Sequence, residues 1–324
     1  MKRHTQDEFV QAHEARWRHL ETLLEQKQSL YQHPAAEISR FAEDYRVVCG
    51  HLMYARSTGF GSELVSYLDG LAGRAHNVLY GARPFRMGAL WALVGRRFPR
   101  ALRRRWRAFG ISNLLFYGPF FAALFLTLQS PGFAAEVLPK SMLEGMADMY
   151  STSHTGREIG TDAAMAGHYI YNNIGIAFRC FATGILLGLG SMFFLVYNGL
   201  IIGTVVGYVI YRGHGENILT FVCGHGSFEL TGIVISGAAG MVMGYALVDT
   251  GGRSRLESLR ACGPDVGAMI SGAGLMLLIA AFIEGFWSPS GIAPPIKWSV
   301  AAGLWLAVAV YLVIAGRGAR RVKP

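Results

Sequence analysis

The chain has 324 residues, of which 52% are hydrophobic and only 16% are charged. This balance is unusual for a soluble protein of this size and indicates a membrane protein. The net charge of +9 is compatible with a nucleic-acid partner. Seven arginines lie between Arg96 and Arg107, directly before the first apolar run, so we expect anionic membrane lipid as the partner and no nucleic acid. The four cysteines give no disulfide framework.

Residues 1–82 are predicted to form a cytoplasmic helical module, because apolar residues recur there at helical spacing among charged ones. Pro34 and the stretch STGFGS at 57–62 separate three such runs, and Ser62 is a candidate N-cap. We therefore expect three helices. Their apolar positions are Phe9, Trp17, Leu20 and Leu24, then Ile38, Phe41, Tyr45, Val48, Leu52 and Ala55, then Leu64, Leu68, Leu71, Ala75 and Leu79.

Residues 83–109 place an apolar stripe opposite a row of arginines, which is the pattern of an amphipathic helix that lies in the membrane surface. Pro99 is expected to divide this helix in two. A helix buried against the soluble module is the alternative. The arginines predicted to face lipid are Arg96, Arg97, Arg100, Arg103, Arg104, Arg105 and Arg107.

The remaining chain, 110–316, is predicted to be a transmembrane bundle, because one crossing needs only about 20 apolar residues. One run is too long for a single crossing, since its 39 residues, 173–211, would form a helix of roughly 58 Å. We expect it to fold into two spans at the turn signal Asn198-Gly199. Six crossings result. The nearly uncharged runs cover about 110–128, 173–211, 226–248, 267–287 and 297–315.

Six crossings place the module, the arginine cluster, the loop GGRSRLESLR and the basic tail 317–324 on one side, which agrees with the positive-inside rule. Five crossings are the alternative, and they would place the last two basic segments outside. The N-terminus and C-terminus are then both expected in the cytoplasm. The opposite side would receive a loop at 129–172, a connection at 212–225 and the stretch at 288–295.

Small residues recur every four positions in several spans, which allows close approach between helix backbones. Such stripes serve equally within one bundle and between subunits, so a homo-oligomer stays open. The positions are Gly184 with Gly188, then Gly199, Gly203 and Gly207, then Gly232, Ser236, Gly240 and Gly244.

Three charged residues interrupt the apolar runs: Arg179, Glu229 and Glu284. In the six-span topology they fall at similar depth, so they are expected to form an intramembrane polar cluster together with His225 and Asn173. Such groups need an ionic partner or a water-filled cavity. The two interpretations are a salt bridge that fixes helix order and a polar site that has a function.

No catalytic residue or cofactor is expected. The string H-E-x-x-H of zinc proteases is absent, Ser227 lacks a G-x-S-x-G elbow, and no phosphate-binding G-x-x-x-x-G-K-[ST] occurs. His225 and Glu229 alone supply two potential metal ligands, and the acids and histidines between Asp148 and His168 are irregularly spaced. A metal site is therefore not predicted.

The chain resembles the stage II sporulation protein M family, in its longer non-sporulating bacterial form. The motifs are N-I-x-x-A-F-R from Asn173, the glycine-rich segment that follows it, H-G-x-x-E-L from His225, and FIEGFWSP. The N-terminal stretches DYRVVCGHLMYAR and LDGLAGRAHNVLY extend the resemblance over nearly the whole chain. In spore formers, the short member of this family anchors peptidoglycan-degrading enzymes that drive engulfment. The basic N-terminal module and the arginine-rich surface helix of this chain exceed what that short protein has, so the resemblance does not extend to the engulfment role.

The resemblance implies an all-α, multi-pass protein of the bacterial inner membrane that has no catalysis of its own. It also implies a scaffold for an envelope-associated complex, with MoxR-type AAA ATPases and von Willebrand A-domain proteins as partners. A transporter or channel-like permease component is the alternative, with Arg179, Glu229 and Glu284 as its polar site.

Overall fold

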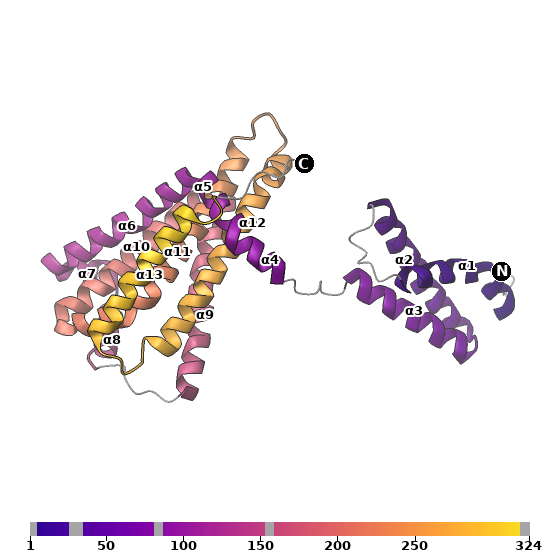
Figure 1. Cartoon of the computed structure of the whole chain (residues 1–324), viewed down its shortest axis with the longest axis horizontal. Coiled ribbons are helices and arrows are strands. Elements are labelled where there is room, and N and C mark those ends of the chain that lie inside the picture. The colour runs from indigo at the N-terminus through magenta and orange to yellow at the C-terminus, as the bar shows by residue number, and fades with distance from the viewer. Residues whose placement is uncertain (1–4, 26–34, 81–86, 153–158, 318–324) are drawn as a thin grey trace. The chain divides into compact units, whose positions relative to one another are not determined.

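A computed structural model describes residues 5–25, 35–80, 87–152 and 159–317. Within these ranges all regular elements are helical, which confirms the all-α class (Figure 1). The chain divides into two compact units, Met1–Phe85 and Arg86–Pro324. The tail 318–324 and residues 83–86 of the predicted interfacial segment lie outside the described residues.

The first unit contains the three helices that the sequence predicts, α1 (Gln6–Glu25), α2 (Ala35–Thr58) and α3 (Ser62–Tyr80). Its core contains all the predicted apolar positions except Ile38, and Trp17, Leu20 and Phe41 are fully buried in it. The Trp17 indole N–H donates to Nδ1 of His51 over 2.9 Å, which ties α1 to α2. The unit therefore has a hydrophobic core of its own.

The second unit is a bundle of long helices. Short helices precede and interrupt it: α4 (Met87–Ala92), a π-helical turn at Leu93–Arg97, α5 (Phe98–Arg104), α7 (Gly132–Val137) and α8 (Lys140–Met149). The long helices are α6 (Trp106–Gln129), α9 (Ile159–Ala182), α10 (Leu189–Val209), α11 (Gly215–Val248), α12 (Arg255–Phe282) and α13 (Pro294–Ile314). The predicted loop at 129–172 is thus largely helical.

Helices α6 and α10 run parallel in direct backbone contact. A Cβ atom added at Gly199 would meet the carbonyl oxygen of Phe116, and one added at Gly203 would meet that of Phe120. Both pairs advance by four residues, so the two helices run in the same direction. One added at Gly207 would meet Leu124 and Thr127.

The predicted turn at Asn198-Gly199 does not form, because both residues lie inside α10. The Asn198 amide donates to the carbonyl of Phe194 within the helix, and Gly199 provides room for α6. The chain instead breaks between α9 and α10, in a 3-10 turn at Thr183–Ile185 that is followed by Leu187 and Gly188 at positive φ. Tertiary packing, rather than a turn, explains the glycine.

Helices α10 and α11 form an antiparallel hairpin. An added Cβ at Gly237 would meet Leu195, one at Gly240 would meet Ser191, and one at Gly244 would meet Gly188. The reversal occurs at Gly213, whose φ of 87° is in the left-handed region that glycine adopts at little cost. Helix α11 then begins at Gly215, so most of the connection expected at 212–225 is helical.

The other small positions of α11 also lie at helix contacts. An added Cβ at Gly232 would meet Leu277 of α12, and Gly184 lies against Gly240. Ser236 is fully buried, and its hydroxyl donates to the carbonyl of Gly232.

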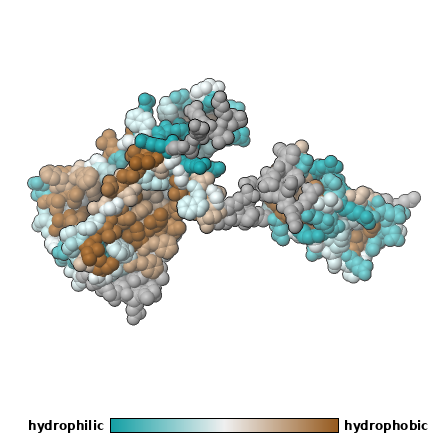
Figure 2. Space-filling view, in the orientation of Figure 1, coloured by the Kyte–Doolittle hydropathy of each residue, from teal (hydrophilic) through white to brown (hydrophobic). Residues whose placement is uncertain are grey.

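Four helical segments among the described residues are long and apolar enough to cross a membrane: Trp106–Gln129, Leu189–Val248, Arg255–Trp287 and Pro294–Ile314. The second contains the α10–α11 hairpin, and α9 is not among the four. The predicted count of six crossings is therefore not established by this criterion. Figure 2 shows a largely apolar face along α13, where Leu306, Val310 and Val313 are exposed.

The expectation that all seven arginines face lipid needs correction. Phe98 and Leu102 of α5 are buried in the bundle core against α11, α12 and α13, so α5 is a packed part of the bundle. Arg103 donates to the carbonyls of Leu312 and Ala315, and Arg100 donates to that of Gly316, at the end of α13. A helix end leaves four carbonyls unpaired, and Arg103 satisfies that of Leu312, while the other two acceptors directly follow the helix.

Two more of the seven bind the bundle, because Arg104 and Arg105 both pair with Asp265 of α12. Arg96, Arg97 and Arg107 are exposed, and Arg107 lies over the Trp106 ring. These three remain candidates for lipid contact.

Candidate functional site

The predicted polar cluster forms around His225 and Glu229, which lie one turn apart on α11. Their spacing of four residues places both side chains on one helix face. His225 Nε2 is 3.6 Å from Glu229 Oε2 and 4.0 Å from Glu284 Oε1. His225 is 3% exposed and Glu284 is 8% exposed. One imidazole and two carboxylates therefore meet in the interior of the bundle.

Glu284 reaches this point from a π-helical turn, Ile283–Trp287, at the end of α12. The Ser288 N–H donates to the carbonyl of Ile283, five residues back. Such a widened turn changes the direction of the side chains that follow it, and it occurs frequently at functional sites.

A second layer of polar groups orients the cluster. Asn173 of α9 donates from its amide to Glu284 Oε2 over 3.3 Å, and Nδ1 of His225 lies 3.1 Å from the Ser288 hydroxyl. Lys297 of α13 is buried and donates to the carbonyls of Ser288 and Ser290. Because Nδ1 is engaged with Ser288, Nε2 is the ring nitrogen that faces the carboxylates.

Arg179 does not belong to the cluster, so the prediction that it joins the intramembrane polar cluster is wrong. It is exposed, and among the described residues it forms no ion pair. It follows Asn173 by six residues, which is roughly 9 Å along α9 and about two thirds of a turn around it. The position of the turn explains the error. Helix α9 begins at Ile159 and ends at Ala182, so Arg179 lies in its last turn and not near its start.

Four of the predicted cluster residues are thus brought together, and the sequence reasoning missed Ser288 and Lys297. Lys297 carried a signal, since it is a lone cation at the head of an apolar run, as Glu284 is near the end of one. Ser288 lies within the motif FIEGFWSP, but nothing in its spacing linked it to His225, because a serine beside a proline is common in loops.

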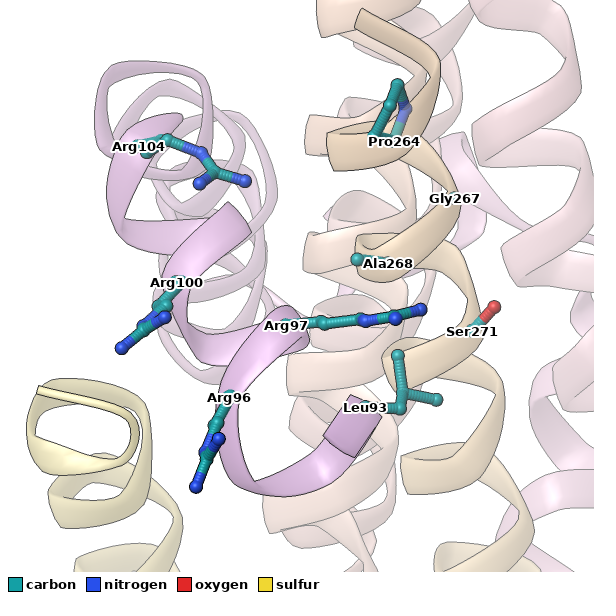
Figure 3. Close-up of a pocket in the computed structure, with 9 residues that line it drawn as sticks. All are labelled: Leu93, Arg96, Arg97, Arg100, Arg104, Pro264, Gly267, Ala268 and Ser271. Atoms are coloured by element: carbon teal, nitrogen blue, oxygen red, sulfur yellow. The ribbon is translucent and has the colours of Figure 1, made fainter. Parts of the chain in front are cut away.

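A second candidate site is a groove of about 500 Å³ between α12 and the segment formed by the π-helical turn Leu93–Arg97 and α5. Arg97 and Arg104 extend toward α12 across this groove, whereas Arg96 and Arg100 point toward the end of α13 (Figure 3). The α12 wall is formed by small residues, Gly267, Ala268 and Ser271, together with Pro264. Guanidinium groups over a wall of small side chains suit an anionic group such as a phosphate.

Two family models match parts of this chain. The family model described as stage II sporulation protein M matches residues 111–289, which is more than half of the chain. The chain belongs to this family. The family region contains the polar cluster from Asn173 to Ser288, and it excludes the arginine segment before α6 and Lys297 after α12.

Residues 7–81, which span α1 to α3, match a second model, described as a domain of unknown function (DUF8413). No curated protein and no solved structure matches the chain. This member of the stage II sporulation protein M family is accordingly a multi-pass, all-α membrane protein with an additional N-terminal helical unit.

Proposed function

We propose that this protein is a non-enzymatic anchor that holds an envelope-associated protein complex at the bacterial inner membrane. The observation that supports this role is the division into two units, each with its own core. One unit has the composition of a membrane bundle. The other is a three-helix unit whose surface carries exposed charged residues, and this surface can bind a cytoplasmic partner.

The proposed topology has six crossings, α6 and α9 to α13, with both termini in the cytoplasm. Helix α9 contacts α10, α11 and α12, so it is part of the same bundle as the apolar helices. The parallel run of α6 and α10 and the antiparallel α10–α11 pair agree with that order. It leaves α7 and α8 on the outer side, where they offer a second docking surface.

Anionic lipid is the proposed partner of the arginine-lined groove. Arg97 extends into the groove and is exposed, and Trp91 of the preceding helix α4 is also exposed. Aromatic and basic side chains together are typical of the level of the lipid headgroups. Lipid phosphate bound in this groove would join α5 to α12 and stabilise the bundle.

The test of the anchor role is crosslinked affinity purification from native membranes, with the full chain and with a chain that lacks residues 1–82. The family resemblance implies a MoxR-type ATPase and von Willebrand A-domain proteins as partners. We expect such proteins with the full chain and their loss from the truncated one. Equal recovery from both chains would show that the N-terminal unit does not dock them.

A transporter or permease component is the second candidate, because His225, Glu229 and Glu284 are ionisable groups inside the bundle. Transport predicts substrate-dependent flux in liposomes that contain the purified protein, and Glu229→Gln would abolish it. An anchor gives no flux above that of protein-free liposomes.

A further inference from the structure

We propose that His225, Glu229 and Glu284 bind one divalent transition-metal ion, with zinc as the preferred ion, inside the membrane bundle. The ligands would be His225 Nε2 and one carboxylate oxygen of each glutamate. This inference goes beyond the anchor role and does not depend on it, because it concerns what the bundle holds between α11 and the end of α12.

The geometry fits such an ion. The three candidate ligand atoms all lie within 4.8 Å of one another. Ligands about 2.1 Å from a tetrahedral zinc ion are about 3.4 Å apart. The distances of 3.6 Å and 4.0 Å from His225 Nε2 to the two carboxylates are close to that value. Small side-chain movements therefore suffice to close the site.

The charges require a partner. Two glutamates share this interior position, and the cluster offers no ion pair except those with His225 among the described residues. Lys297 is occupied with the carbonyls of Ser288 and Ser290, and Arg179 is exposed elsewhere on α9. An unpaired charge in a membrane interior is costly. One divalent cation with two carboxylates and a neutral imidazole gives a net charge of zero.

The surrounding groups match those of protein metal sites. A metal-binding histidine donates its other ring N–H to a neighbouring acceptor, which fixes the tautomer and the ring plane. Ser288 is in that position, 3.1 Å from Nδ1. Asn173 likewise donates a hydrogen bond to Oε2 of Glu284, and Oε1 of Glu284 faces His225. His225 Nε2, on a side chain that is 3% exposed, has no hydrogen bond among the described residues and is directed at both carboxylates.

The ligand types select the metal class. One imidazole nitrogen with two carboxylate oxygens suits zinc and related first-row ions, whereas calcium and magnesium prefer oxygen ligands alone. The tetrahedron retains one position beyond the three protein ligands, which water fills in sites of this kind. The ion would connect α11 to the π-helical turn and thereby fix the position of α12.

The experiment uses the full-length chain in detergent with its purification tag removed. The protein is stripped with a chelator, equilibrated with zinc, and analysed for metal by inductively coupled plasma mass spectrometry. We expect about one zinc per chain and a lower thermal midpoint after stripping, which zinc restores. His225→Gln, Glu229→Gln and Glu284→Gln should each reduce the bound zinc at least tenfold.

Two further variants sharpen the test. Ser288→Ala should weaken zinc binding by about 10–100-fold, as expected for a group that orients a ligand. Ser227→Ala is the matched control, because its hydroxyl donates to the carbonyl of Gly224 and does not touch the cluster. It should bind zinc as the wild type does.

X-ray absorption of the zinc-loaded wild type gives a readout that needs no variant. Nitrogen and oxygen ligands at about 2.0–2.2 Å are expected, whereas cysteine sulfur would appear at about 2.3 Å. The proposal is overturned if the wild type equilibrated with zinc retains none, if the three variants bind as much as the wild type, or if the spectrum shows sulfur ligands. Failure of these tests would leave the anchor role intact.

Discussion

The close contact between α6 and α10 predicts that Gly203 tolerates no larger residue. In Gly203→Ala the new Cβ would lie 2.9 Å from the carbonyl carbon of Phe120 and 3.0 Å from its Cα, and nearer still to the carbonyl oxygen. Real Cβ atoms essentially never approach other heavy atoms so closely. The atoms they meet here belong to the backbone of a helix, so no side-chain rotation relieves the clash.

The magnitude follows from two opposing terms. Alanine gains about 1 kcal/mol over glycine in a helix interior. Overpacking of a tight contact costs about 1–3 kcal/mol, and more where a whole helix has to move. Because the clash is with helix backbone, the cost lies at the upper end of this range or above it, and we expect a net loss of about 2 kcal/mol in the free energy of unfolding. For a unit of this size, that loss lowers the thermal midpoint by roughly 4–8 °C.

The assay is thermal unfolding in detergent, followed by fluorescence-detected size exclusion. Gly274→Ala in α12 is the matched control, because nothing lies within 4 Å of its added Cβ. Its midpoint should be unchanged or slightly higher than that of the wild type. If Gly203→Ala melts within 1 °C of the wild type, the close α6–α10 contact is refuted.

Three further predictions address other parts of the chain. Asp265→Asn removes the carboxylate that pairs with Arg104 and Arg105, and it should lower the stability of the bundle by about 1–2 kcal/mol, measured as a lower thermal midpoint. The loss is modest because both arginines are partly exposed, and an unchanged midpoint would contradict the ion pairs. Burial lowers the pKa of His51 to about 4, and its Nδ1 accepts from Trp17, so between about pH 6.5 and 4 the unfolded chain binds a proton that the folded chain does not. Limited proteolysis of the first unit should accelerate from pH 7 to pH 5, and in His51→Gln this pH dependence should be weaker. In a cysteine-free background, a membrane-impermeant maleimide should label Thr152→Cys in intact cells and Arg253→Cys only after permeabilisation; the reverse pattern would invert the proposed topology.

Much of the fold was predictable because its signals are local. The helices of the first unit follow from apolar residues spaced three and four apart, and Phe41, Val48 and Leu68 are buried as this spacing requires. The membrane class follows from composition alone. The polar cluster was predictable in part, because His225 and Glu229 share a helix face by spacing and because charges inside apolar runs attract partners.

The sequence by itself determined the helices of the first unit, the membrane character and the identity of the polar residues, since each depends on neighbouring positions in the chain. The tertiary structure decided what those residues contact. It made Gly199 a packing position instead of a turn, excluded Arg179 from the cluster, and directed Arg103 to the end of α13 instead of to lipid alone. Such outcomes depend on the rotation of each helix and on which helix lies beside it, and neither quantity is contained in hydrophobic periodicity.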